Sequence, residues 1–216
     1  ARFMAVLWGL GREGNRNPGP KEGENPIPCE LDDEQVAYDR VYVDRWWRIL
    51  TRVGIAMERY RSGFVGKSSP VQFYWGDFDL SQSRFSGKPA QPPKGAGRRE
   101  RFANDQENIT SGFWPGGSTF PKPAFYSYIY PTPAGLETAS LRPAAARFDT
   151  TLNEFAMDYD DVRAGADPEE MILEFLRSTY EAGATIGRWD RASLEQPGPD
   201  VGPDLGTTPS KASEPA

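Results

Sequence analysis

The chain has 216 residues, of which 38% are hydrophobic and 12% aromatic, so it is long enough to bury a substantial core. Its net charge of -6 argues against a broad nucleic-acid-binding surface. One cysteine and no histidine exclude an intrachain disulfide and both Ser-His-Asp and Cys-His catalysis, whereas calcium or magnesium on carboxylates stays open.

The ends of the chain differ in composition from its middle. Residues 1–28 join an apolar segment, Phe3 to Leu10, which reads as the remnant of a truncated helix, to a loop rich in Gly and Pro. We expect residues 29–195 to form a single α+β domain and residues 196–216 to be a disordered tail. No apolar run reaches the ~20 residues that span a bilayer, and no secretory signal is present, so we expect a soluble, cytoplasmic protein.

Two stretches have the apolar spacing of amphipathic helices. The first is Gln35–Tyr60, which follows three acidic residues suited to a helix start and precedes Gly63, a suitable end. The second is Glu169–Ile186, which begins after a capping Asp167 and Pro168.

The strands are expected between these helices. Val71–Leu80 reads as a strand or a tight pair of strands, with Gly76 at a turn or bulge, and Ala124–Tyr130 reads as a strand. Arg147–Leu152 and Glu154–Met157 resemble a hairpin. We expect an antiparallel, strongly curved sheet packed by the two helices, with loops or turns over Ser86–Gly97 and Phe113–Gly117.

Three motifs that suggest ligand binding are better explained otherwise. Gly9–Gly14 matches G-x-G-x-x-G but runs into Asn and Pro residues that prevent a helix. Gly66-Lys67-Ser68 lacks the earlier glycine of a phosphate loop and follows a helix. The basic run Lys94–Arg99 is expected to be a solvated loop.

Aromatic residues are concentrated between Pro70 and Tyr130. Alternate strand residues face opposite sides, so these rings cannot all enter one core, and the surplus face could form a ligand cleft, a sugar-stacking platform or a partner surface. Asp77 and Asp79 could bind a hard cation or act in acid-base chemistry, or they could cap a turn or pair with Arg84. The candidate lining residues are Gln72, Asp77, Asp79, Arg84, Gln106, Glu107, Trp114 and Tyr126.

Several strings of this sequence resemble one bacterial family, the domain of unknown function numbered 5996. They include SPVQFYWGDFDL at Ser69–Leu80, GFWPG at Gly112–Gly116, FYSY at Phe125–Tyr128 and FLRSTYEA at Phe175–Ala182. The resemblance runs from about Asn25 to Leu194 and implies no established activity or cofactor. It also implies that this chain is the C-terminal part of a longer protein.

The family pattern places histidine where Gln72 and Gln106 stand, and glutamine cannot titrate near neutral pH.

The sequence leaves three functions open. The first is small-molecule or glycan binding in an aromatic cleft. The second is a hydrolase-like enzyme using carboxylates and a divalent cation, weakened by the two glutamines. The third is an interaction module that packs on a missing N-terminal region.

Overall fold

The structure is a computed structural model that describes residues 38–74, 77–117 and 120–196. The expectations for residues 1–28, for the first residues of the Gln35–Tyr60 helix, for Gly76 and for the tail beyond residue 196 fall outside these ranges. No helix in the described ranges combines the length and the apolar character needed to cross a bilayer.

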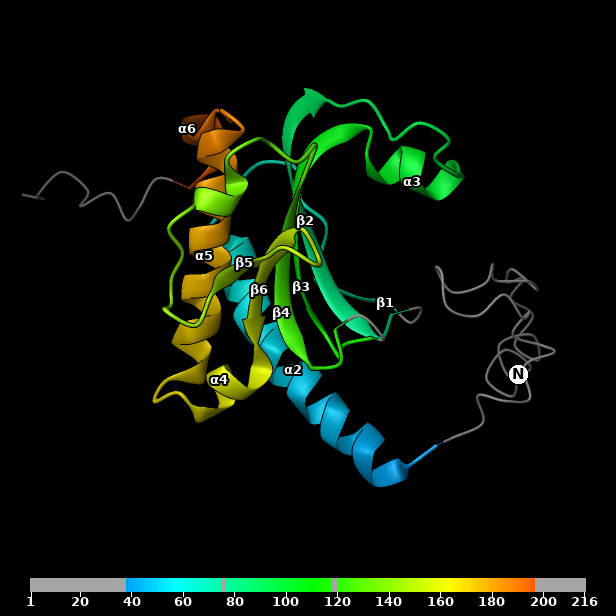
Figure 1. Ribbon diagram of the computed structural model, residues 1–216, viewed down its shortest axis with the longest axis vertical. Helices are drawn as coiled ribbons and strands as arrows, with labels where there is room; N and C mark the ends of the chain where they lie inside the picture. Colours follow the sequence, from blue (N-terminus) through cyan, green and yellow to red (C-terminus); the bar gives the residue numbers. More distant parts are fainter. Residues whose placement is uncertain (1–37, 75–76, 118–119, 197–216) are drawn as a thin grey trace, which may run out of the picture.

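The chain forms an antiparallel six-stranded sheet and a set of helices (Figure 1). The strands are β1 Gln72–Tyr74, β2 Asp79–Pro89, β3 Gln106–Trp114, β4 Ala124–Tyr130, β5 Arg147–Asp149 and β6 Glu154–Asp158. The helices are α2 Arg40–Ser62, α3 Arg98–Ala103, the 3₁₀ helix η1 Leu136–Thr138, α4 Tyr159–Ala164, α5 Pro168–Ile186 and α6 Arg191–Leu194. The sheet order β1-β2-β3-β4-β6-β5 makes β1 and β5 the edges. The expected α+β class and curved antiparallel sheet are therefore confirmed.

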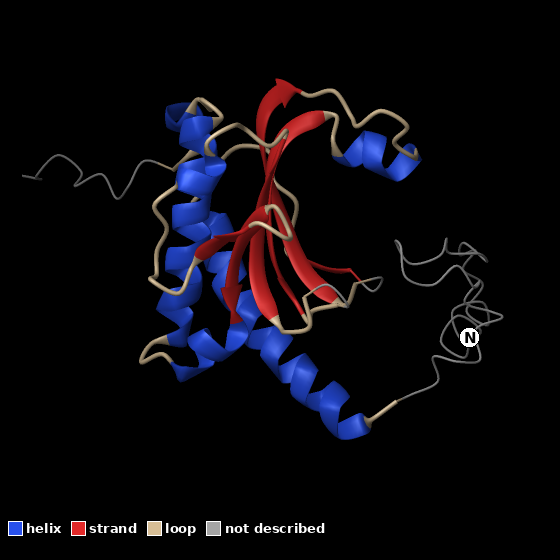
Figure 2. Ribbon diagram, viewed as in Figure 1, coloured by secondary structure: helices blue, strands red, loops and turns tan. Residues whose placement is uncertain are grey.

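The two long helices lie where their apolar spacing predicts. α2 begins after Asp39, whose carboxylate accepts hydrogen bonds from the amides of Val41 and Tyr42, and it ends at Gly63. α5 begins after Asp167, which caps the amide of Glu170. Both helices pack on one face of the sheet, as Figure 2 shows.

The core lies between this face and the helices. Phe113 of β3 is fully buried and contacts the rings of Trp46 from α2, Phe125 from β4 and Tyr159 at the start of α4, with ring centroids 4.7 to 5.5 Å apart. Burying each such ring removes about 150–250 Å² of surface from water, so this cluster holds the helices on the sheet.

Two predicted boundaries are wrong for the same reason. Ser86 to Pro89 were expected to begin a loop but belong to β2, which continues to Pro89 through an irregularity in its pairing with β3. The expected aromatic turn at Phe113 also begins as strand, since β3 pairs with both neighbours through Phe113. In both places long-range pairing outweighs the local turn residues. The Val71–Leu80 segment is the pair of strands β1 and β2.

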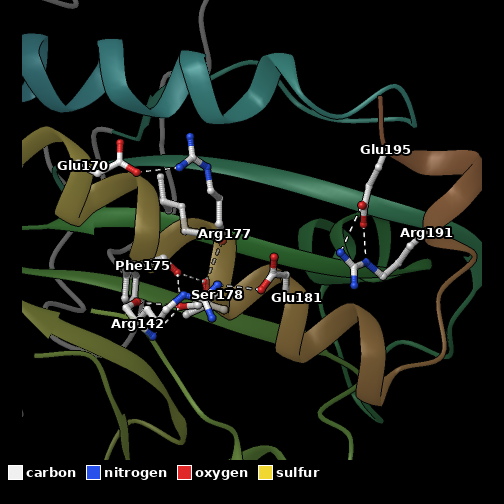
Figure 3. Close-up of polar contacts among 10 residues, drawn as sticks. Arg142, Glu170, Phe175, Arg177, Ser178, Glu181, Arg191 and Glu195 are labelled. Carbon is white, nitrogen blue, oxygen red and sulfur yellow. Dashed lines mark hydrogen bonds and ion pairs between the residues drawn. The ribbon is translucent and has the colours of Figure 1, made fainter. Parts of the chain in front are cut away.

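The loop between β4 and β5 is fixed to α5. The Arg142 amide donates to the Ser178 hydroxyl at 3.1 Å, and that hydroxyl donates to the Arg142 carbonyl at 2.8 Å. The Arg142 guanidinium also pairs with Glu181 at 3.0 Å, as Figure 3 shows. The same view shows the local pair of Arg191 in α6 and Glu195 at its end. The Arg142 contacts hold the β4–β5 loop against α5.

Arg84 of β2 joins the sheet to both long helices. Its side chain points toward the helices, is 4% exposed and donates to the Tyr60 carbonyl in the last turn of α2 at 2.5 Å. Its guanidinium lies 3.5 Å from the ring centre of Tyr60, 4.9 Å from Phe64 and 4.6 Å from Tyr180 of α5. In the described ranges no carboxylate lies within ion-pair distance of it, so its direct partners are aromatic rings and one carbonyl, and the Glu195 carboxylate acts on its charge from farther away.

Replacing Arg84 should therefore destabilise the domain. We expect Arg84→Ala to lower the free energy of unfolding by about 3–5 kcal/mol, because a cavity and an unpaired carbonyl remain. Arg84→Lys should lower it by about 1–2 kcal/mol, because an ammonium cannot stack flat on the rings. Urea unfolding measures both, with the exposed Arg163→Ala as a control expected within about 0.5 kcal/mol of wild type. An Arg84→Ala protein as stable as this control would contradict the assignment.

Candidate functional site

Strand alternation gives the sheet two faces of different character. Leu80, Gln82 and Arg84 of β2 face the helices, so Asp79, Ser81 and Ser83 face the other way. We call this second side the open face, because α2, α4 and α5 all pack on the first. The register gives the open face these residues: Gln72, Tyr74, Asp79, Ser81, Ser83, Phe85, Gln106, Asn108, Thr110, Gly112, Trp114, Ala124, Tyr126, Tyr128, Tyr130, Arg147, Asp149, Glu154, Ala156 and Asp158.

At the centre of the open face, Tyr126 reaches across a whole strand to Asp79. Its hydroxyl donates to the Asp79 carboxylate at 2.6 Å, although β3 separates β4 from β2. Gly112 of β3 makes this possible. A Cβ at Gly112 would stand 2.4 Å from the Tyr126 ring and 2.3 Å from the Leu80 carbonyl. The glycine therefore fixes the position of the tyrosine and its carboxylate partner.

Asp79 is flanked by tyrosines from two sides. Tyr74 of β1 is its cross-strand neighbour in the register, is 46% exposed and donates to Gln72 at 3.0 Å. Asp79 itself is only 7% exposed, and burial raises its pKa, while the Tyr126 hydrogen bond works in the opposite direction. Burial and the neighbouring carboxylate raise the pKa of Tyr126 well above the usual value, so the tyrosine keeps its proton and acts as the donor.

Further polar groups extend this arrangement along the sheet. The Tyr128 ring lies parallel to Tyr126, with centroids 6.3 Å apart. The hydroxyls of Ser83 and Thr110 are 2.7 Å apart, and Thr110 donates to Asn108 at 3.0 Å. On β6, burial raises the pKa of Glu154 to about 7, and this carboxylate is close enough to Tyr128 to raise the tyrosine's pKa as well.

The candidate lining residues predicted from the sequence lie on both faces of the sheet. Five of them, Gln72, Asp79, Gln106, Trp114 and Tyr126, lie on the open face. Arg84 faces the helices, and so does Glu107, which accepts from Ser86 and pairs with Lys88. Asp77 lies in the turn between β1 and β2, close enough to raise the pKa of Asp79.

Gln72 and Gln106 share the open face but lie at different ends of it. Gln72 is level with Ser81 and Gly112, whereas Gln106 stands six positions before Gly112 on β3, opposite Pro89. At about 3.3 Å per residue this is roughly 20 Å along the strand, so one small molecule cannot contact both side chains.

Sequence reasoning did not select Tyr74, Gly112, Tyr128 or Glu154. Tyr128 carried a usable signal, because it stands two residues after Tyr126 and so shares its face on a strand. Tyr74 carried the same signal relative to Gln72. The sequence gives no such signal at Gly112 and Glu154, because the contacts of these residues depend on which strands are neighbours in the sheet.

Two other features lie outside the open face. A groove of about 600 Å³ runs between α2 and the β1–β2 edge, lined by residues such as Ile55, Val71 and Leu80. Large apolar side chains are exposed at Tyr38 before α2 and in its first turns, at Val41, Tyr42, Val43 and Trp47. Such a patch is what the interaction alternative requires. In the described ranges no three or more Asp, Glu or Cys side chains are grouped closely enough to hold a metal ion.

Gly112→Ala should disrupt the open face. Its Cβ would meet backbone as well as the Tyr126 ring, so we expect a loss of about 2–4 kcal/mol in unfolding free energy and of the Tyr126–Asp79 contact. Gly97→Ala is the matched control, because its Cβ would meet nothing within 4 Å, and it should stay within about 0.5 kcal/mol of wild type. Thermal and urea unfolding measure both, and equal stability of the two variants would refute the close approach.

Glu154 should make stability depend on pH. Its pKa is higher in the folded than in the unfolded chain, so the folded state holds the extra proton and loses stability as pH rises from about 5 to 8. Glu154→Gln should match wild type near pH 5 and exceed it at pH 8 by a difference on the order of 2 kcal/mol. Urea unfolding at several pH values measures this, and parallel curves for both proteins would rule out a buried, uncompensated carboxylate.

Comparison with known proteins gives a family without a known activity. No curated protein and no solved structure matches this chain. One family model, described as a family of unknown function, DUF5996, matches residues 1–196 of the 216. That match includes every strand of the sheet and both long helices. The chain with the tyrosine-lined open face therefore belongs to the DUF5996 family of unknown function.

Proposed function

We propose that this protein binds a small organic molecule on the open face of its sheet, around Asp79, Tyr126 and Tyr128. The observation that carries the proposal is the Tyr126–Asp79 contact over Gly112. A carboxylate that is only 7% exposed, as Asp79 is, destabilises the fold unless its interactions offset the lost hydration. Aromatic walls with a few convergent polar groups are the usual form of a small-molecule site.

The rigidity of this face supports binding. The tyrosines and Asp79 stand on adjoining strands of one continuous sheet, so their relative positions are set by backbone pairing rather than by loops. Ligand binding then requires little ordering of the protein, which saves conformational entropy. Saccharides belong to the ligand classes that such rings and hydroxyls accept, so glycan binding is included in the proposal.

The test is a ligand screen read by amide chemical shifts. A library of neutral, cationic and anionic metabolites, including saccharides, is added to the labelled protein. We expect at least one class to shift the amides of Asp79, Thr110, Gly112 and Tyr128 in a saturable way. Tyr126→Phe should weaken that binding by about tenfold, because the Asp79 carboxylate loses the hydrogen bond that holds it in position.

Ile55→Ala serves as the matched control, because Ile55 lines the groove on the other side of β2 and its replacement should leave the affinity unchanged. Shifts confined to the groove residues, or no saturable shift from any class, would overturn the proposal.

A further inference from the structure

The charges on the open face are not balanced. Its centre holds Asp79, and Glu154 stands beside Tyr128, but in the described part of the chain neither carboxylate forms an ion pair. The basic residues near Asp79 and Glu154 in the sheet contact other partners. Arg147 pairs with Asp158 at 2.8 Å, Lys122 pairs with the same carboxylate at 3.4 Å, and Lys67 lies over the Phe85 ring. Arg147 shares the open face but is paired with Asp158, so in the described part of the chain Asp79 and Glu154 are negative charges without a paired cation.

The rings around Asp79 suit one kind of guest. Tyr74 stands directly opposite Asp79 on β1, Tyr126 reaches it from β4, and Tyr128 continues the row of rings. The electron-rich faces of tyrosine rings attract cations, most strongly where water is excluded. A half-enclosed carboxylate between such rings is the combination that binds a positively charged nitrogen.

Three ligand classes can be ranked on these grounds. An anion would approach two carboxylates, and in the described part of the chain no unpaired basic side chain stands at the centre of the face. A metal ion needs several oxygen ligands, and in the described ranges no such group of acidic side chains exists. A neutral sugar would gain ordinary hydrogen bonds, whereas an organic cation would gain an ion pair with Asp79 and contacts with the rings.

We propose that the ligand of the open face is an organic cation, whose ammonium group contacts the Asp79 carboxylate between the rings of Tyr74 and Tyr126. This inference rests on the proposed function and narrows it to one chemical class. It also assigns Asp79 the role of the charge partner, with Glu154 adding negative potential from β6. The raised pKa of both carboxylates fits a site that lacks its positive partner.

The experiment compares choline with its uncharged isostere 3,3-dimethylbutan-1-ol and with glucose, on the same labelled protein. We expect choline to shift the amides around Asp79 and Tyr126 at millimolar concentration, with an affinity at least about tenfold above that of the isostere. Choline binding should weaken as pH falls through the pKa of Asp79, because protonation removes the negative charge.

Asp79→Asn tests the assigned carboxylate. This variant should lose about tenfold or more in choline affinity and keep its response to uncharged ligands. Asp160→Asn, on the exposed surface of α4, is the control and should bind choline as wild type does. If Asp79→Asn fails to fold, the comparison of choline with its isostere on the unaltered protein still decides.

The outcomes separate the two proposals. Isostere or glucose binding as tight as choline binding at the open face would overturn the inference and leave the proposed function standing. No choline binding, or choline binding that Asp79→Asn leaves unchanged, would also overturn the inference. The proposed function fails only if the wider library produces no saturable shift on this face.

Discussion

The placement of Arg84 in the middle of β2 is the constraint on which the layers depend. A buried guanidinium must find partners or it destabilises the fold, and here the rings of Tyr60, Phe64 and Tyr180 with one helix carbonyl provide them. These partners come from the end of α2, the segment after it and α5. The same contact therefore joins both helices to one face of β2.

On the open face, aromatic rings again surround a charged side chain, which here is the negative carboxylate of Asp79. Asp79 stands five residues before Arg84 on β2, and the odd separation turns the carboxylate to the open face. There, Tyr126 can reach it only because Gly112 leaves room on the intervening strand. One strand thus carries a cation that packs against the helix layer and an anion on the opposite face of the sheet.

Much of the fold was predictable from local signals. The apolar spacing and the caps at Asp167 and Gly63 predict the two long helices, and the aromatic run Ala124–Tyr130 predicts β4. The full lengths of β2 and β3 were not predictable, because their ends are held by pairing between segments about twenty residues apart. The candidate residues were chosen by proximity in sequence, which gathered Arg84 and Asp79 although they lie on opposite faces.

By itself the sequence determined the α+β class, the positions of the main helices and the family resemblance, since these depend on the order of residue types along the chain. It also placed Asp79, Gln72 and Tyr126 among the residues of interest. Which of them are in contact depends on the folded arrangement of the strands. Strand order brings β4 within reach of β2 across a glycine, and a contact between residues 47 positions apart leaves no periodic trace in the sequence.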